Sequence, residues 1–226
     1  KLSAEEGKLL ETYFDVENIA YWMAFQLLTD NVDTQSRNMY LYSPQNSDTW
    51  YILDWDNDDM LRRKEHELIR FTDAESWEWG ISNYWGNVLF RRCLQTASYR
   101  EALDTAVQEL HDYLNADRIE EMTAHYRTIT EQYIWQMPDM EHLPLTRTQY
   151  DMVAKALPEE IEENYQQYPE GYHYPMPFYI GTPSLQNGVL QLSWDTSYDF
   201  NAEDISYTVE LARDYQFRQM VYREEH

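Results

Sequence analysis

Residues 30–59 read DNVDTQSRNMYLYSPQNSDTWYILDWDNDD, and this stretch decides how the rest of the chain is interpreted. Its two runs of aromatic and large aliphatic residues, at 39–42 and 50–55, flank a segment rich in Pro, Asn, Ser and Asp. That pattern predicts two short strands joined by a turn, which is a β-hairpin. The preceding residues 15–31 place apolar side chains at helical spacing behind Asp15, a residue type that caps helix N-termini.

Three oxygen-bearing side chains surround the predicted hairpin. Asp33 and Asn38 lie in the loop before it with D-x-x-x-x-N spacing, and Asp56 directly follows its second strand. Phosphoryl transfer to a hydroxyl requires a carboxylate that accepts the hydroxyl proton and oxygen ligands that hold magnesium on the phosphates. The C-terminal lobe of a protein kinase presents those groups in the same order along its chain: a helix, a D-x-x-x-x-N loop, a hairpin and an Asp.

The middle of the chain, from residue 85 to about 168, has the apolar spacing of helices. Ser98 and Glu101 predict a capping box at the start of one helix, and Asn115 predicts the N-cap of the next. Pro158 fits the first turn of a last short helix. The predicted fold class is therefore mainly α with a small β-hairpin, in the manner of a kinase C-lobe.

Beyond residue 168 the sequence pattern is no longer that of helices. We expect a helical lobe over residues 1–168, a linker rich in Pro, Gly and Tyr over 169–178, and a partial all-β sandwich over 179–226. The segments VLQLSW (189–194) and ISYTVEL (205–211) alternate apolar and polar residues with period two, which indicates strands.

Composition excludes several functions. Of the 226 residues, 41 are Asp or Glu and 17 are Lys or Arg, so the formal net charge is −24 at pH 7. Broad nucleic-acid binding needs basic residues that neutralise phosphates, and anionic membrane is disfavoured for the same reason. No apolar run approaches the roughly 18 residues of a membrane span, so no membrane insertion is expected. The single Cys93 excludes an internal disulfide and indicates a small buried apolar side chain.

Four segments together resemble a known family. They are FDVENIAYWMAFQLLTDNVD (14–33), NMYLY (38–42), WD (55–56) and VLFRRCL (88–94), and the resemblance spans residues 14–165. The stretch is similar to the CotH kinase family, atypical protein kinases of spore coats. This resemblance implies an Mg-ATP-dependent transferase that phosphorylates Ser or Thr hydroxyls of a protein.

The resemblance also implies residue roles. Asp33 corresponds to the catalytic-loop aspartate, Asn38 and Asp56 to the residues that hold magnesium and the nucleotide, and Asp58 to the second acid of the family's W-D-x-D. Kinase chemistry further needs a Gly-rich loop and a strand lysine from an N-lobe. We expect this chain, which begins KLSAEEGK, to be a fragment that is inactive without that lobe.

Two alternatives stay open for the same acids and aromatics. Asp54, Asp56, Asp58 and Glu65 occupy positions 1, 3, 5 and 12 of a calcium loop of the EF-hand type, although Asp59 stands where that loop needs Gly. Calcium is therefore a possible cofactor. The second alternative is a non-catalytic cell-surface binding module for glycan or protein.

The tail has a resemblance of its own. LQLSWDTSYDFNAEDISYTVELARDYQF (190–217) is similar to the opening strands of a fibronectin type III module, with Trp194 in its core and Tyr207 and Val209 on the third strand. Such modules are typical of proteins outside the cytoplasm. Together the two resemblances imply a secreted or cell-surface protein with partners at the cell surface or envelope.

Overall fold

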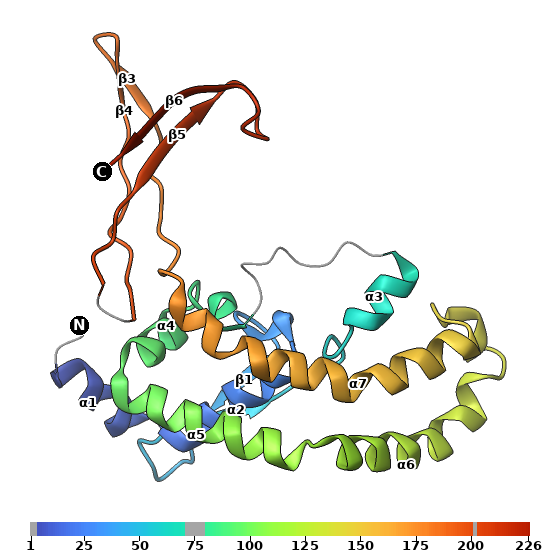
Figure 1. Cartoon of the computed structure of the whole chain (residues 1–226). Coiled ribbons are helices and arrows are strands. Elements are labelled where there is room, and N and C mark those ends of the chain that lie inside the picture. The colour runs from blue at the N-terminus through green and yellow to red at the C-terminus, as the bar shows by residue number, and fades with distance from the viewer. Residues whose placement is uncertain (1–3, 71–79, 201–202) are drawn as a thin grey trace. The chain divides into compact units, whose positions relative to one another are not determined.

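The computed structural model describes residues 4–70, 80–200 and 203–226, and the chain divides into two compact units between Gly171 and Tyr172 (Figure 1). The first unit is helical and contains a hairpin, whereas the described part of the second unit has short strands and no α-helix. The domain boundaries expected from the sequence stay a prediction.

Seven α-helices are described in the chain. They are α1 (Ala4–Tyr13), α2 (Val16–Leu28), α3 (Arg63–Ile69), α4 (Val88–Gln95), α5 (Ala97–Tyr113), α6 (Ala116–Ile134) and α7 (Arg147–Gln167). Short 3-10 turns occur at η1 (Val32–Thr34), η3 (Gly80–Tyr84), η4 (Asp139–His142) and η5 (Pro169–His173). This content confirms the mainly α fold class of the first unit.

The core of the helical unit forms around α2, which contacts α5, α7 and the hairpin. Apolar side chains lie on every side of α2, as expected for a helix that is enclosed by its neighbours. Ile19, Met23 and Leu28 are fully buried there, and Tyr99 and Leu103 of α5 are equally buried. The expectation for Cys93 is confirmed, because its side chain is buried and burial raises the pKa of its thiol to about 12.

Two predicted helix starts are wrong. The helix expected to begin with the Ser98 capping box begins earlier, and its N-cap is Thr96. Pro158 does not open a short helix but lies inside the 21-residue α7. The true start of α7 is a capping box formed by Thr146 and Gln149, whose reciprocal hydrogen bonds satisfy the exposed amides there.

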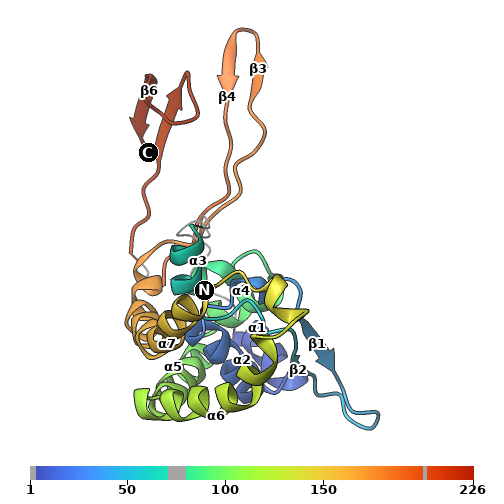
Figure 2. The same cartoon turned by 90° about the vertical axis from the view of Figure 1, so that its right-hand side faces the viewer.

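The predicted hairpin is confirmed. Strand β1 (Met39–Tyr42) pairs antiparallel with β2 (Tyr51–Asp54), and the register places Met39 opposite Asp54. Asn18 of α2 fixes the hairpin, because its side chain accepts a hydrogen bond from the Ile52 amide (2.7 Å) and donates one to the Ile52 carbonyl (3.2 Å). In Figure 2 the turn end of the hairpin projects away from the helices.

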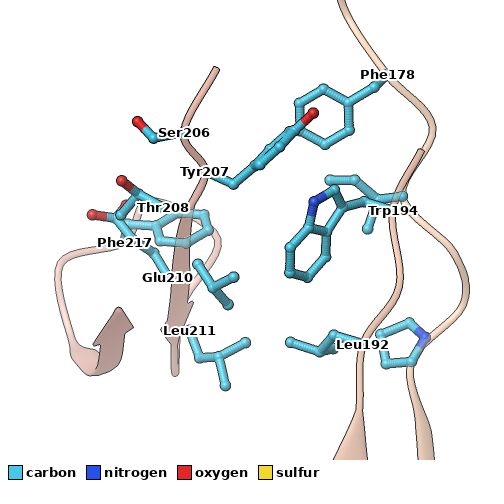
Figure 3. Close-up of a pocket in the computed structure, with 12 residues that line it drawn as sticks. Phe178, Leu192, Trp194, Ser206, Tyr207, Thr208, Glu210, Leu211 and Phe217 are labelled. Atoms are coloured by element: carbon cyan, nitrogen blue, oxygen red, sulfur yellow. The ribbon is translucent and has the colours of Figure 1, made fainter. Parts of the chain in front are cut away.

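In the described residues of the second unit, the strands form two separate hairpins. Strand β3 (Ser184–Gln186) pairs with β4 (Val189–Gln191), and β5 (Thr208–Ala212) pairs with β6 (Met220–Glu225). A cavity of about 550 Å³ lies between them. Figure 3 shows Leu192 and Trp194 on one side of this cavity and Tyr207 and Leu211 on the other.

Candidate active site

The loop that carries Asp33 follows α2 and is held in place by buried polar contacts. The Thr34 hydroxyl donates to the Asn31 carbonyl (3.0 Å) and lies 3.2 Å from the Tyr84 hydroxyl. The Asn83 amide donates to the Val32 carbonyl (2.9 Å). Because Asn83 and Tyr84 belong to η3, the folding of the helical half helps to fix the backbone on both sides of Asp33.

Asp33 and Asn38 are in direct contact. The Asn38 side-chain amide donates a hydrogen bond to Asp33 Oδ2 (2.8 Å), and Arg37 Nε donates to Asp33 Oδ1. The Asp33 side chain is 19% exposed, whereas that of Arg37 is 72% exposed. Since the amide nitrogen of Asn38 is used on Asp33, its Oδ1 remains an acceptor that can serve as a metal ligand.

The hairpin register brings Asp56 to the same end of the hairpin as Asn38. Asn38 directly precedes β1 and Asp56 follows β2 by two residues, while Met39 and Asp54 are paired. Both Asn38 (φ 55°) and Asp56 (φ 61°) have left-handed backbone conformations, which Asn and Asp tolerate better than most residues.

The pKa of Arg37 depends on the acidic residues near it. The hydrogen bond and charge of Asp33 raise the pKa of Arg37, and the charges of Asp59 and Asp56 raise it further. Asp56 and Asp59 therefore lie within electrostatic reach of the guanidinium that pairs with Asp33. Arg37 is the cation paired with Asp33, and no feature of the sequence pattern indicates this pair.

Asp54 joins the end of the hairpin to the core. Its carboxylate accepts hydrogen bonds from Gln26 Nε2 (2.8 Å) and Asn57 Nδ2 (2.6 Å), and Asn31 Nδ2 donates to Asn57 Oδ1 (3.1 Å). The network links α2, the loop before Asp33 and the segment after β2. The sequence feature that indicates this network is Gln26, a polar residue within the apolar run of α2.

The remaining predicted metal ligands differ in their surroundings. Asp58 is exposed. Glu65 pairs with Arg62 at 3.3 Å, and Asp59, which stands where a calcium loop needs Gly, pairs with the same Arg62 at 2.6 Å. Among the residues that the structure describes, no group of three or more His, Cys, Asp or Glu is arranged to hold a metal ion. The calcium loop is therefore unsupported, and Glu65 has a cationic partner instead.

Magnesium needs fewer protein ligands than calcium does. It is usually held by one or two protein ligands together with phosphate oxygens and water. An amide oxygen from Asn38 and a carboxylate from Asp56, at one end of a hairpin, fit that requirement. The donor chemistry is therefore compatible with magnesium on a nucleotide, and the site residues themselves stay a prediction.

The helical unit, with its loop and hairpin, is a kinase-like lobe. A family described as CotH kinase protein matches residues 2–168, so this chain belongs to the CotH kinase family. No curated protein and no solved structure matches the chain. In the described part of the chain, no helix is both long enough and apolar enough to cross a bilayer.

Proposed function

We propose that this chain forms the C-terminal lobe of an Mg-ATP-dependent phosphotransferase that acts on Ser or Thr hydroxyls of a protein outside the cytoplasm. The observation that carries the proposal is the hydrogen-bonded pair of Asp33 and Asn38, located at the same end of the hairpin as Asp56. Membership of the CotH kinase family supports the kinase-like class.

Each residue has a separate role in this proposal. Asp33 accepts the proton of the acceptor hydroxyl, and the Asn38 amide orients its carboxylate through the 2.8 Å hydrogen bond. Asn38 Oδ1 and the Asp56 carboxylate would hold magnesium, which would supply positive charge to the phosphates during transfer. Arg37, ion-paired with Asp33, keeps one positive charge among these acids.

The three lysines that lie within the described residues indicate what else the reaction requires. Lys8, Lys64 and Lys155 lie on α1, α3 and α7, and Lys64 pairs with Glu67. A kinase places its phosphate-binding lysine on a strand. The proposal therefore assigns that lysine and the Gly-rich loop to an N-lobe in a longer protein.

The test uses the protein with that lobe. Asp56→Asn should abolish magnesium-dependent ATP binding, measured by isothermal titration. Asp33→Asn should retain binding and lower the rate of phosphate transfer by about 10²- to 10⁴-fold, as expected for a general base. Asp48→Asn, in the exposed turn of the hairpin, removes the same charge and is the control. Equal transfer rates for wild type and Asp33→Asn would remove Asp33 from the mechanism.

One observation favours a second candidate function, a surface-binding module. The cavity of the second unit is lined by Phe178, Trp194, Tyr207 and Phe217, and the rings of Phe178 and Tyr207 meet edge to face. A concave, largely apolar and aromatic lining of this kind is typical of ligand-binding sites. Loss of cell-surface binding in Trp194→Ala, with no effect of Asp33→Asn, would favour this function.

A further inference from the structure

Two amide side chains of the helical unit have buried oxygens that no donor reaches. Gln26 on α2 and Asn31 in the loop after α2 are each 1% exposed. Within the described residues, no protein group donates a hydrogen bond to Gln26 Oε1 or to Asn31 Oδ1. Folded proteins rarely leave a buried acceptor unpaired, and an internal water often supplies the donor where the protein does not.

The Asp54 carboxylate determines which way these amides point. A carboxylate only accepts hydrogen bonds, so Gln26 turns its nitrogen toward Asp54 (2.8 Å), and Asn57 does the same (2.6 Å). The oxygen of Asn57 consequently faces Asn31, which donates to it from Nδ2 (3.1 Å). Turning any of these amides around would place oxygen against oxygen. The hydrogen-bond network therefore fixes the positions of Gln26 Oε1 and Asn31 Oδ1.

A small cavity of about 10 Å³ lies beside both residues. Gln26 and Asn31 line it together with Asn83 and Tyr84 of η3. The hydrogen bonds of Asn83 and Tyr84 go to the loop that carries Asp33, and not to the two amide oxygens. The cavity has room for about one water molecule and is too small for an organic ligand.

We propose that one water molecule is bound in this cavity and donates one hydrogen bond to Gln26 Oε1 and the other to Asn31 Oδ1. The two O–H groups of a single water match the two unpaired acceptors, and a polar cavity of this size is the kind of site that holds internal water. The water links α2 to the loop before Asp33. This inference does not depend on the transferase activity proposed above.

A metal cation fits the same cavity less well. Calcium and magnesium take about six or more oxygen ligands. The cavity offers the two amide oxygens and the side chain of Asp30, which is ion-paired with Arg63 (3.4 Å). The positive charge of Arg63 beside Asp30 opposes the binding of a second cation. The arrangement therefore favours a neutral ligand with two donors, which is water.

A high-resolution crystal structure of the 226-residue chain tests the proposal. It should show one density peak at about 2.8 Å from both Gln26 Oε1 and Asn31 Oδ1, the usual distance for a water donor. Absence of this peak would overturn the proposal, and so would a peak surrounded by six close oxygen ligands.

Thermal unfolding of the same chain distinguishes water from a monovalent cation. Bound water predicts the same melting temperature in NaCl, KCl and choline chloride at equal ionic strength. A melting temperature that rises and saturates with NaCl or KCl, but not with choline chloride, would show that the ligand is a cation and would refute the proposal.

Nuclear magnetic resonance tests the site in solution. The side-chain amide protons of Asn31 should show nuclear Overhauser effects to water, whose opposite sign in the rotating frame separates them from proton exchange. Gln26→Met removes one acceptor at similar volume and should abolish these effects. Gln108→Met, the same change at an exposed position of α5, should preserve them. Persistence of the effects in Gln26→Met would contradict the proposal. If Gln26→Met does not fold, the crystal structure and the salt comparison of the wild-type chain still decide.

Discussion

The helical unit and the strand unit differ in how they bury apolar side chains. Within the described residues, the buried apolar side chains all belong to the unit that ends at Gly171, and none to the unit that begins at Tyr172. In the strand unit, Phe178, Leu185 and Phe217 are exposed. The difference shows that apolar content alone does not make a core, because elements must also be long enough to enclose one another.

Element size explains the difference. Helices α5, α6 and α7 contain 17, 19 and 21 residues, and α5 and α7 enclose α2 together with the hairpin. The strands of the second unit contain three to six residues and form two-stranded sheets. Isolated hairpins are marginally stable in water. The helical unit should therefore dominate the stability of the chain.

The largest expected effect is a loss of core packing in the helical unit. Leu103→Ala removes a fully buried side chain from α5 and should lower the free energy of unfolding by about 3 kcal/mol. The measurement is urea unfolding followed by circular dichroism at 222 nm. Leu211→Ala, in the second unit, should leave that transition in place. Equal shifts from both variants would contradict the comparison.

A smaller effect is expected where the hairpin joins the helical core. Asn18→Ala removes both hydrogen bonds to the backbone of Ile52 and should lower the free energy of unfolding by roughly 1–2 kcal/mol. Hydrogen exchange of the Ile52 amide should accelerate, and the exposed Asn46→Ala should leave it unchanged. Unchanged protection in Asn18→Ala would show that pairing with β1 alone holds the hairpin.

Local sequence patterns predicted the elements of the helical unit well. Asp15 caps α2 and Asn115 caps α6, as expected, because each side chain accepts a hydrogen bond from a backbone amide of the first helical turn. The hairpin strands also follow their local pattern. The failures at Ser98 and Pro158 have one cause: the packing of α5 and α7 against other helices outweighs the local signal.

The site was only partly predictable for a different reason. The spacing of Asp33 and Asn38 suggested that they act together, and the structure joins them by a hydrogen bond. The roles of Gln26 and Asp54 depend on partners 28 residues apart, which no local pattern reveals. Arg37 was missed because nothing in the local sequence pattern indicates its ion pair with Asp33.

The smallest expected effect concerns a buried carboxylate of the helical unit. Burial raises the pKa of Glu160 on α7, although the Lys64 amide donates to its carboxylate (2.9 Å) and the charge of Arg63 opposes the shift. The folded chain therefore binds this proton more tightly than the unfolded chain does. It follows that ionised Glu160 lowers stability as the pH rises above the ordinary glutamate pKa of about 4.5.

Glu160→Gln should consequently raise the melting temperature at pH 7, because the amide oxygen can still accept from Lys64 while no charge is buried. We expect a gain of roughly 2 °C, typical of a change worth less than 1 kcal/mol. The gain should disappear near pH 4, where the wild-type carboxyl is protonated. The exposed Glu225→Gln of the second unit should give no such pH-dependent gain. A Glu160→Gln chain that is less stable than wild type at pH 7 would show that the attraction to Arg63 outweighs the cost of burial.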